Sequence, residues 1–252
     1  MSFDVAAEAY DRFMGRYSTL LSAQLADFAG VRAGQRALDV GCGPGALTGE
    51  LVARLGPAAV VAVDPSEPFV RAARARHPGV DVRQAPAERM PFDDRSFDVV
   101  LAQLVVHFMS DPVGGLTEMK RISATDGLVA ACVWDFGGER GPISTFWNAA
   151  RSLDPTVEDE SHLAGVRDGH LADLFGSAGL RGVEQTALSV SLDHPGFDSW
   201  WDPFVQGVGP AGAYAKSLDP ERQGALREAC RARLPDGPFT ITAWAWAARG
   251  RA

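Results

Sequence analysis

Three alternating glycines follow directly on a short apolar run near residue 40. Residues 37–45 read Ala-Leu-Asp-Val-Gly-Cys-Gly-Pro-Gly, and a helical pattern begins at Leu47. Because glycine lacks a Cβ atom, Gly41, Gly43 and Gly45 allow a ligand to lie against the backbone. At the carboxyl end of a first strand, this arrangement predicts a bound nucleotide-like molecule. A plain tight turn is the alternative interpretation.

The spacing of the glycines argues against a phosphate-binding loop. The chain has G-x-G-x-G, whereas the dinucleotide fingerprint is G-x-G-x-x-G, and the Gly-Lys-Ser/Thr of a Walker loop is missing. Asp39, just before the glycines, would repel a pyrophosphate but can accept hydrogen bonds from backbone amides or an ammonium group. Asp64 ends a second apolar strand, where an acid either binds ribose hydroxyls or caps the next helix. The sequence therefore favours a ligand with a ribose and no pyrophosphate.

Composition limits the remaining classes of function. The chain has 252 residues, a net charge of −8 and three widely spaced cysteines. The acidic balance argues against a broad nucleic-acid surface. No Cys/His cluster suggests a metal, and no apolar run approaches the roughly 20 residues of a membrane helix. We expect a cytoplasmic protein, without a metal, that is a monomer or a homodimer.

The first half of the chain alternates between strand and helix patterns. Strands are expected over 36–40, 60–63, 80–84, 98–104 and 128–134, separated by helical segments, after one or two helices over 4–28. This alternation predicts a parallel sheet. The second half has helical stretches, a polar loop over 154–167, and strands over 183–192 and 239–247. We expect one domain, 1–252, with elaborations of the sheet over 135–170 and 197–235.

Five segments, in their order along the chain, resemble the motifs of class I S-adenosylmethionine-dependent methyltransferases. They are Leu38–Gly45, Val61–Ser66, Gln84–Phe92, Ser96–Val100 and Gly127–Val129. The nearest subgroup is similar to the methyltransferases of ubiquinone and menaquinone biosynthesis. The resemblance implies a Rossmann-like α/β fold with seven mostly parallel strands, of which the last is antiparallel. It also implies an N-terminal helical lid over 1–30 and a helical insertion between strands six and seven.

The resemblance implies a set of residues that hold the cofactor. The first motif and the ribose motif supply Asp39, Gly41, Cys42, Gly43, Gly45, Asp64, Pro65 and Ser66. Ala87 and Glu88 would flank the adenine, and Gln103 would face the methionine amino group or the acceptor. Tyr10, Arg16 and Tyr17 on the N-terminal lid would meet the methionine carboxylate, although the aromatic residues there could simply dock the helix on the sheet. Pro86 stands where the family usually has an acid that bonds the adenine amino group.

The acceptor side is less defined by the sequence. His107 follows the fourth strand and could take a proton from the acceptor, or it could pack against the Phe108 turn. Aromatic residues of the two elaborations would cover a flat or apolar acceptor, unless they pack on one another; these are Trp147, Trp200, Trp201 and Phe204.

The expected function is transfer of a methyl group from S-adenosylmethionine to a small-molecule acceptor by in-line displacement, with S-adenosylhomocysteine as product. This chemistry needs alignment of the two reactants and exclusion of water, but no metal. A cofactor-binding regulatory protein that has lost the transferase activity is the alternative. A nicotinamide oxidoreductase is disfavoured by the glycine spacing.

Overall fold

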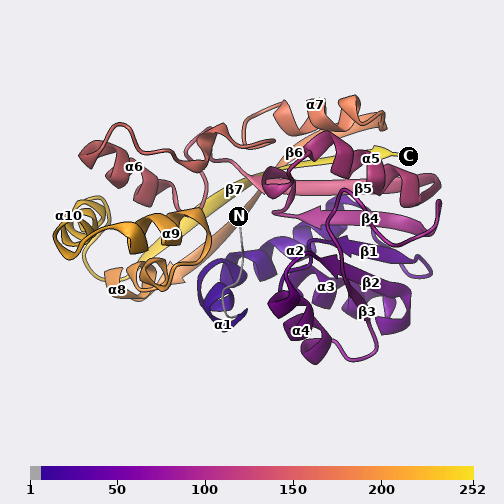
Figure 1. Ribbon diagram of the computed structural model, residues 1–252, viewed down its shortest axis with the longest axis horizontal. Helices are drawn as coiled ribbons and strands as arrows, with labels where there is room; N and C mark the ends of the chain where they lie inside the picture. Colours follow the sequence, from indigo (N-terminus) through magenta and orange to yellow (C-terminus); the bar gives the residue numbers. More distant parts are fainter. Residues whose placement is uncertain (1–6) are drawn as a thin grey trace.

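The computed structural model describes residues 7–252, and it contains one seven-stranded sheet with helices on both faces (Figure 1). The expectation that a helix begins at Asp4, and the first six residues of the proposed 1–30 lid, lie outside the described residues. The strands are β1 (Ala37–Val40), β2 (Val60–Asp64), β3 (Asp81–Gln84), β4 (Phe97–Gln103), β5 (Ser123–Trp134), β6 (Arg181–His194) and β7 (Phe239–Arg251).

The order of strands across the sheet is β3-β2-β1-β4-β5-β7-β6. The pairs among β1 to β5 are parallel, and β7 runs antiparallel to both of its neighbours, β5 and β6. Ala37 of β1 pairs with Val60 of β2 on one side and with Val99 of β4 on the other. The sheet therefore confirms the predicted topology, and it places the switch in strand order between β1 and β4, where ligands bind in folds of this kind.

Helices cover the two faces of the sheet in separate layers. One layer contains α2 (Arg16–Phe28), α3 (Ala46–Leu55) and α4 (Glu67–Arg76), and the other contains α5 (Pro112–Ile122) and α7 (His170–Ser177) (Figure 1). Leu21 and Leu51 pack in the first layer with Val99, whereas Leu116 and Phe175 pack in the second. The strands β1 and β2 are buried throughout, as their mostly apolar sequence predicts.

The remaining helices gather beyond the end of the sheet at which β6 and β7 project past the other strands (Figure 1). They are α6 (Ser144–Leu153), followed in the chain by the short turn η4 (Glu160–His162), and α8 (Phe197–Trp201), η5 (Phe204–Gln206), α9 (Gly209–Ser217) and α10 (Pro220–Arg231). The last four lie between β6 and β7 in the chain, as predicted.

The N-terminal segment is a broken helix. A single turn, α1 (Ala7–Tyr10), leads into a π-helical turn, η1 (Asp11–Gly15), and then into α2. Phe13 of η1 stacks edge to face on Phe204, with ring centroids 4.9 Å apart. The turn η1 is thus held against the helices that follow β6, although the two segments are about 190 residues apart in sequence.

Candidate active site

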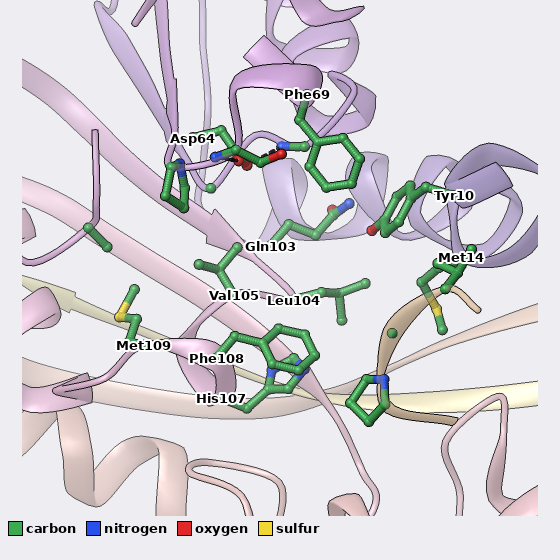
Figure 2. A pocket seen from close by; sticks show the side chains of 18 of the residues that line it. Tyr10, Met14, Asp64, Phe69, Gln103, Leu104, Val105, His107, Phe108 and Met109 are labelled. Atoms are coloured by element: carbon green, nitrogen blue, oxygen red, sulfur yellow. Dashed lines mark hydrogen bonds between the residues drawn. The ribbon is translucent and has the colours of Figure 1, made fainter. Parts of the chain in front are cut away.

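A cavity of about 650 Å³ opens at the carboxyl ends of β1, β2 and β4. Figure 2 shows Asp64 and Phe69 at one end and His107 and Phe108 at the other, with Gln103, Leu104 and Val105 between them. Tyr10 and Met14, from the N-terminal segment, lie along one side. Ten of the residues predicted from the sequence line this cavity: Tyr10, Gly41, Gly43, Asp64, Pro65, Ser66, Ala87, Glu88, Gln103 and His107.

The glycine loop and Asp64 form one hydrogen-bonded unit. The amides of Gly41 and Cys42 donate to the carbonyl of Val63, at 2.8 and 2.9 Å. The amide of Gly43 donates to Asp64 Oδ2 at 2.8 Å, and that of Ser66 donates to Asp64 Oδ1 at 2.8 Å. The carboxylate is therefore fixed between two loops while its edge faces the cavity.

Burial raises the pKa of Asp64, and the hydrogen bonds from the amides of Ser66 and Gly43 oppose that rise. Each carboxylate oxygen has a lone pair beyond the one used by the amide. Asp64 can thus accept further hydrogen bonds from the hydroxyls of a bound ribose.

Two glycines of the loop serve different purposes. Gly41 has φ +69°, and a Cβ there would lie 2.4 Å from Val105 Cγ2. Gly43 has φ +53°, but a Cβ there would meet no atom within 4 Å. Gly41 is thus required for packing inside the protein, whereas the space beside Gly43 belongs to the cavity. This open cradle fits a ligand that lies against the loop.

Gln103 provides a polar atom that the protein itself leaves unpaired. Its Nε2 donates to the Ser18 carbonyl at 3.0 Å and to Ser22 Oγ at 3.1 Å, which orients the side chain. Its Oε1 is buried and has no hydrogen-bond partner among the described residues. Such an atom is costly unless a ligand donates to it. An ammonium group in the cavity would satisfy it, so the residues present fit an amino-acid-bearing cofactor.

Several predicted residues lie outside the cavity. Asp39 is buried and accepts a hydrogen bond of 2.6 Å from Thr48 Oγ1. Arg16 donates to the carbonyl of Asp193 at 3.1 Å, and the Tyr17 hydroxyl lies 3.0 Å from His194 Nε2. Cys42 and Gly45 also face away from the cavity lining. These residues therefore lie behind the cavity wall and do not line the cavity.

The aromatic residues expected to cover the acceptor are packed on one another. Trp200, Trp201 and Phe204 are buried, and Phe204 stacks on Phe146 with ring centroids 4.5 Å apart. None of these three lines the cavity, and neither does Trp147. The elaborations reach the cavity through other residues: Phe136, Ile143, Glu160, Val208, Gly209, Pro210 and Ala211.

Glu160 is a site residue that the sequence did not reveal, because it lies in a polar segment without periodicity. Its side chain lines the cavity and is only 4% exposed. Its Oε2 accepts a hydrogen bond of 2.9 Å from Trp147 Nε1. Burial raises the pKa of Glu160 to about 7, and the bond from Trp147 opposes this rise.

His107 also lines the cavity, on the short turn η3 (Val106–Phe108), with its ring centroid 4.0 Å from that of Phe108. Burial lowers the pKa of His107 to about 3. Its Nδ1 is buried and has no hydrogen-bond partner in the described part of the chain. The imidazole is therefore neutral over the physiological range.

Over residues 7–252, no group of three or more His, Cys, Asp or Glu side chains is placed to hold a metal ion. In the same residues no helix has both the length and the apolar character needed to cross a membrane.

Comparison with known proteins adds to this geometry. Residues 38–131 match the family described as Methyltransferase domain. The chain is 32% identical over 185 residues to the malonyl-[acyl-carrier protein] O-methyltransferase of Geobacter sulfurreducens, covering 72% of this chain and 67% of that protein. The corresponding enzyme of Erwinia billingiae is 34% identical over 128 residues. That match covers 51% of this chain and 50% of the relative, so the chain spans about half of its length.

The fold also has counterparts among solved structures. A candidate methyltransferase from Bacillus halodurans superimposes with a TM-score of 0.60 at 19% identity, covering 91% of this chain and 97% of that one. This likeness supports the fold described above.

Proposed function

Because the chain belongs to the class I S-adenosylmethionine-dependent methyltransferases, we propose that it transfers a methyl group from S-adenosylmethionine to a small-molecule acceptor. The observation that carries the proposal is a single cavity with two unlike ends. At one end Gly43, Asp64 and Gln103 offer groups suited to a ribose and an ammonium; at the other, residues of the elaborations offer a mostly apolar wall.

The protein's own residues would supply binding and alignment. Asp64 and the glycine loop would hold the ribose, Ala87 and Glu88 would border the adenine, and Gln103 would accept from the methionine amino group. Tyr10 and Met14 would cover the site from the N-terminal segment. S-adenosylmethionine supplies an electrophilic methyl group on a sulfonium sulfur, so the enclosure mainly excludes water and directs the acceptor.

The test combines binding and turnover. Titration calorimetry with S-adenosylhomocysteine should show binding to the wild type. Asp64→Asn should weaken it at least tenfold, because the amide nitrogen replaces an oxygen that accepts from the Gly43 or Ser66 amide and that is available to the ribose. Asp81→Asn, an exposed acid in an ion pair with Arg83 on β3, is the matched control and should bind like the wild type.

Release of S-adenosylhomocysteine from S-adenosylmethionine in the presence of a metabolite panel then tests transfer. Binding without product formation across such a panel would favour the alternative, a regulatory protein. A protein that binds neither S-adenosylmethionine nor S-adenosylhomocysteine would contradict the proposal. The absence of nucleic-acid acceptors, the oligomeric state and a cytoplasmic location stay predictions.

A further inference from the structure

A buried carboxylate stands in the acceptor-side wall of the cavity. Glu160 opens the turn η4, and the backbone of this turn is fixed by its neighbour: Asp159 Oδ1 accepts from the Ser161 amide at 2.8 Å. Asp159 also forms an ion pair with Arg151 of α6. The position of Glu160 is therefore set by the packing of η4 against α6, as expected of a group that must meet a ligand in a defined place.

The surroundings of Glu160 do not provide a positive charge. The other residues that the elaborations contribute to the cavity are uncharged and include Phe136, Ile143 and Val208. Among residues 7–252, the Trp147 indole is the one side chain that donates a hydrogen bond to this carboxylate, and no Lys, Arg or His forms an ion pair with it. A buried carboxylate with one neutral donor is costly unless it takes up a proton or meets a further donor. The cavity is the direction from which a further donor can come.

Two groups on this side of the cavity could receive a proton, and they differ as bases. A general base works best when its pKa is near the working pH. Burial lowers the pKa of His107 to about 3, whereas burial raises that of Glu160 to about 7. His107 can accept a hydrogen bond but would hold a proton poorly. The sequence alone suggests only His107 as the group that takes the acceptor's proton.

We propose that Glu160 binds the nucleophilic O–H or N–H of the methyl acceptor and receives its proton. The inference rests on the proposed methyltransferase function and specifies the acceptor class: a largely apolar molecule that bears a neutral hydroxyl or amine. As the lone pair of the acceptor oxygen or nitrogen forms a bond to the methyl carbon, the S–CH₃ bond breaks with its electron pair remaining on sulfur, and the acceptor's proton passes to the Glu160 carboxylate. Trp147 acts as a positioning residue through its N–H.

A set of three ring-matched probes tests the recognition step without knowledge of the natural acceptor. Calorimetry at pH 8 would measure binding of 2-naphthol, 2-naphthylamine and 2-methylnaphthalene to the protein saturated with S-adenosylhomocysteine. The first two should bind the wild type more tightly than the third, because only they donate to Glu160. Comparison of the first two tells whether the acceptor is a hydroxyl or an amine.

The key variant is Glu160→Gln, which keeps an oxygen for the Trp147 N–H but turns an NH₂ group toward the cavity. It should weaken binding of the two donor probes about tenfold or more, and leave binding of 2-methylnaphthalene and of S-adenosylhomocysteine unchanged. Glu158→Gln, the same change two residues away at an exposed position, is the control and should bind all three probes like the wild type.

The pH dependence separates the carboxylate from other groups. The affinity for 2-naphthol should rise with pH through a midpoint near 7, and Trp147→Phe should move the midpoint upward, because the hydrogen bond that lowers the pKa of Glu160 is lost. The other titratable side chains that line the cavity are Tyr10, Asp64, Glu67, Glu88 and His107, and those on η4 and the segments near it include Glu139, Arg151, Asp159, His162 and Tyr214.

Equal binding of the donor probes by the wild type and Glu160→Gln would overturn the inference. So would failure of both donor probes to bind a wild-type protein that binds S-adenosylhomocysteine. If S-adenosylhomocysteine itself does not bind, the proposed function fails instead, and the two failures are thus distinguishable.

Discussion

Thr48 Oγ1 donates a hydrogen bond of 2.6 Å to Asp39 Oδ2, and both side chains are buried. The bond joins β1 to the first turn of α3, across the glycine loop that connects them. Asp39 was expected either to order the loop or to bind an ammonium group. With its carboxylate paired inside the protein and away from the cavity lining, the geometry favours the first of these roles.

The first prediction concerns Asp39 and pH. Burial raises the pKa of Asp39 to about 7, whereas an aspartate in the unfolded chain has a pKa of about 4. The folded protein therefore binds an extra proton between these values, and the free energy of unfolding falls as pH rises from about 4 to 7. Asp39→Asn stays neutral and still accepts from Thr48, so its stability relative to the wild type should increase across this window.

The expected gain is roughly 1.4 kcal/mol for each unit by which the pKa is raised. Urea unfolding at pH 5 and at pH 8 measures it, with Asp81→Asn as the exposed control. Because Glu160 titrates over the same range in all three proteins, the comparison cancels its contribution. Parallel pH curves for wild type and Asp39→Asn would contradict the prediction.

The second prediction concerns the glycine loop. In Gly43→Ala the added methyl group meets no protein atom, so the protein should fold with a loss of roughly 1–2 kcal/mol from the left-handed backbone. The methyl group would occupy space in the cradle, and S-adenosylhomocysteine should bind at least tenfold more weakly in calorimetry.

Gly30→Ala is the matched control, since Gly30 also has a positive φ (+66°) and no neighbour within 4 Å, but lies in an exposed turn outside the cavity. It should carry the same loss of stability with unchanged affinity. If both variants bind alike, the space beside Gly43 is not used by the ligand.

The third prediction concerns the N-terminal segment. Arg76, the last residue of α4, donates to Asp11 Oδ1 at 3.1 Å and forms an ion pair with this residue of η1. η1 also supplies Phe13 and Met14 to the cavity. Arg76→Gln should therefore speed dissociation of S-adenosylhomocysteine, by up to about fivefold because partly exposed ion pairs contribute at most about 1 kcal/mol.

Stopped-flow displacement measures this rate. Arg71→Gln removes the same charge from the same helix, where the pair with Glu67 lies within α4. Arg71→Gln should leave the dissociation rate unchanged. An equal increase of this rate in both variants would indicate a general effect of charge and not a specific effect of the ion pair between α4 and η1.

The fourth prediction concerns the adenine end. Pro86 lines the cavity at the position where the resemblance leads one to expect an acid. Because proline has no side-chain acceptor for the adenine amino group, Pro86→Asp should tighten S-adenosylmethionine binding in calorimetry. Pro91→Asp, an exposed proline of the same loop outside the cavity lining, should not. Unchanged or weaker binding in Pro86→Asp would show that the backbone already serves the adenine.

Local patterns were sufficient for the sheet and for one end of the site. Short, mostly apolar runs identified β1, β2 and β4, since strands buried on both faces need mostly apolar side chains. Parallel strands end at one edge, so Gly43, Asp64 and Gln103 could be brought together from their places along the chain alone. All three line the cavity.

Local patterns did not identify the side chains of the elaborations that line the cavity. Glu160 lies in a polar stretch without periodicity, and its position in the cavity wall follows from the packing of η4 against α6, where Trp147 donates to it. Trp200, Trp201 and Phe204 have an aromatic composition that suits either a ligand or a small core. Only their mutual contacts, and the docking of Phe13 on Phe204, decide for the core.

The sequence by itself determined the family, the order of strand and helix, and the part of the cavity that we propose for the cofactor, because these depend on residues close together in sequence or at the ends of adjacent strands. The tertiary structure alone decided which side chains reach the acceptor half. That half is formed by segments up to about 190 residues apart, and whether a side chain there faces a ligand or its neighbours depends on how those segments pack.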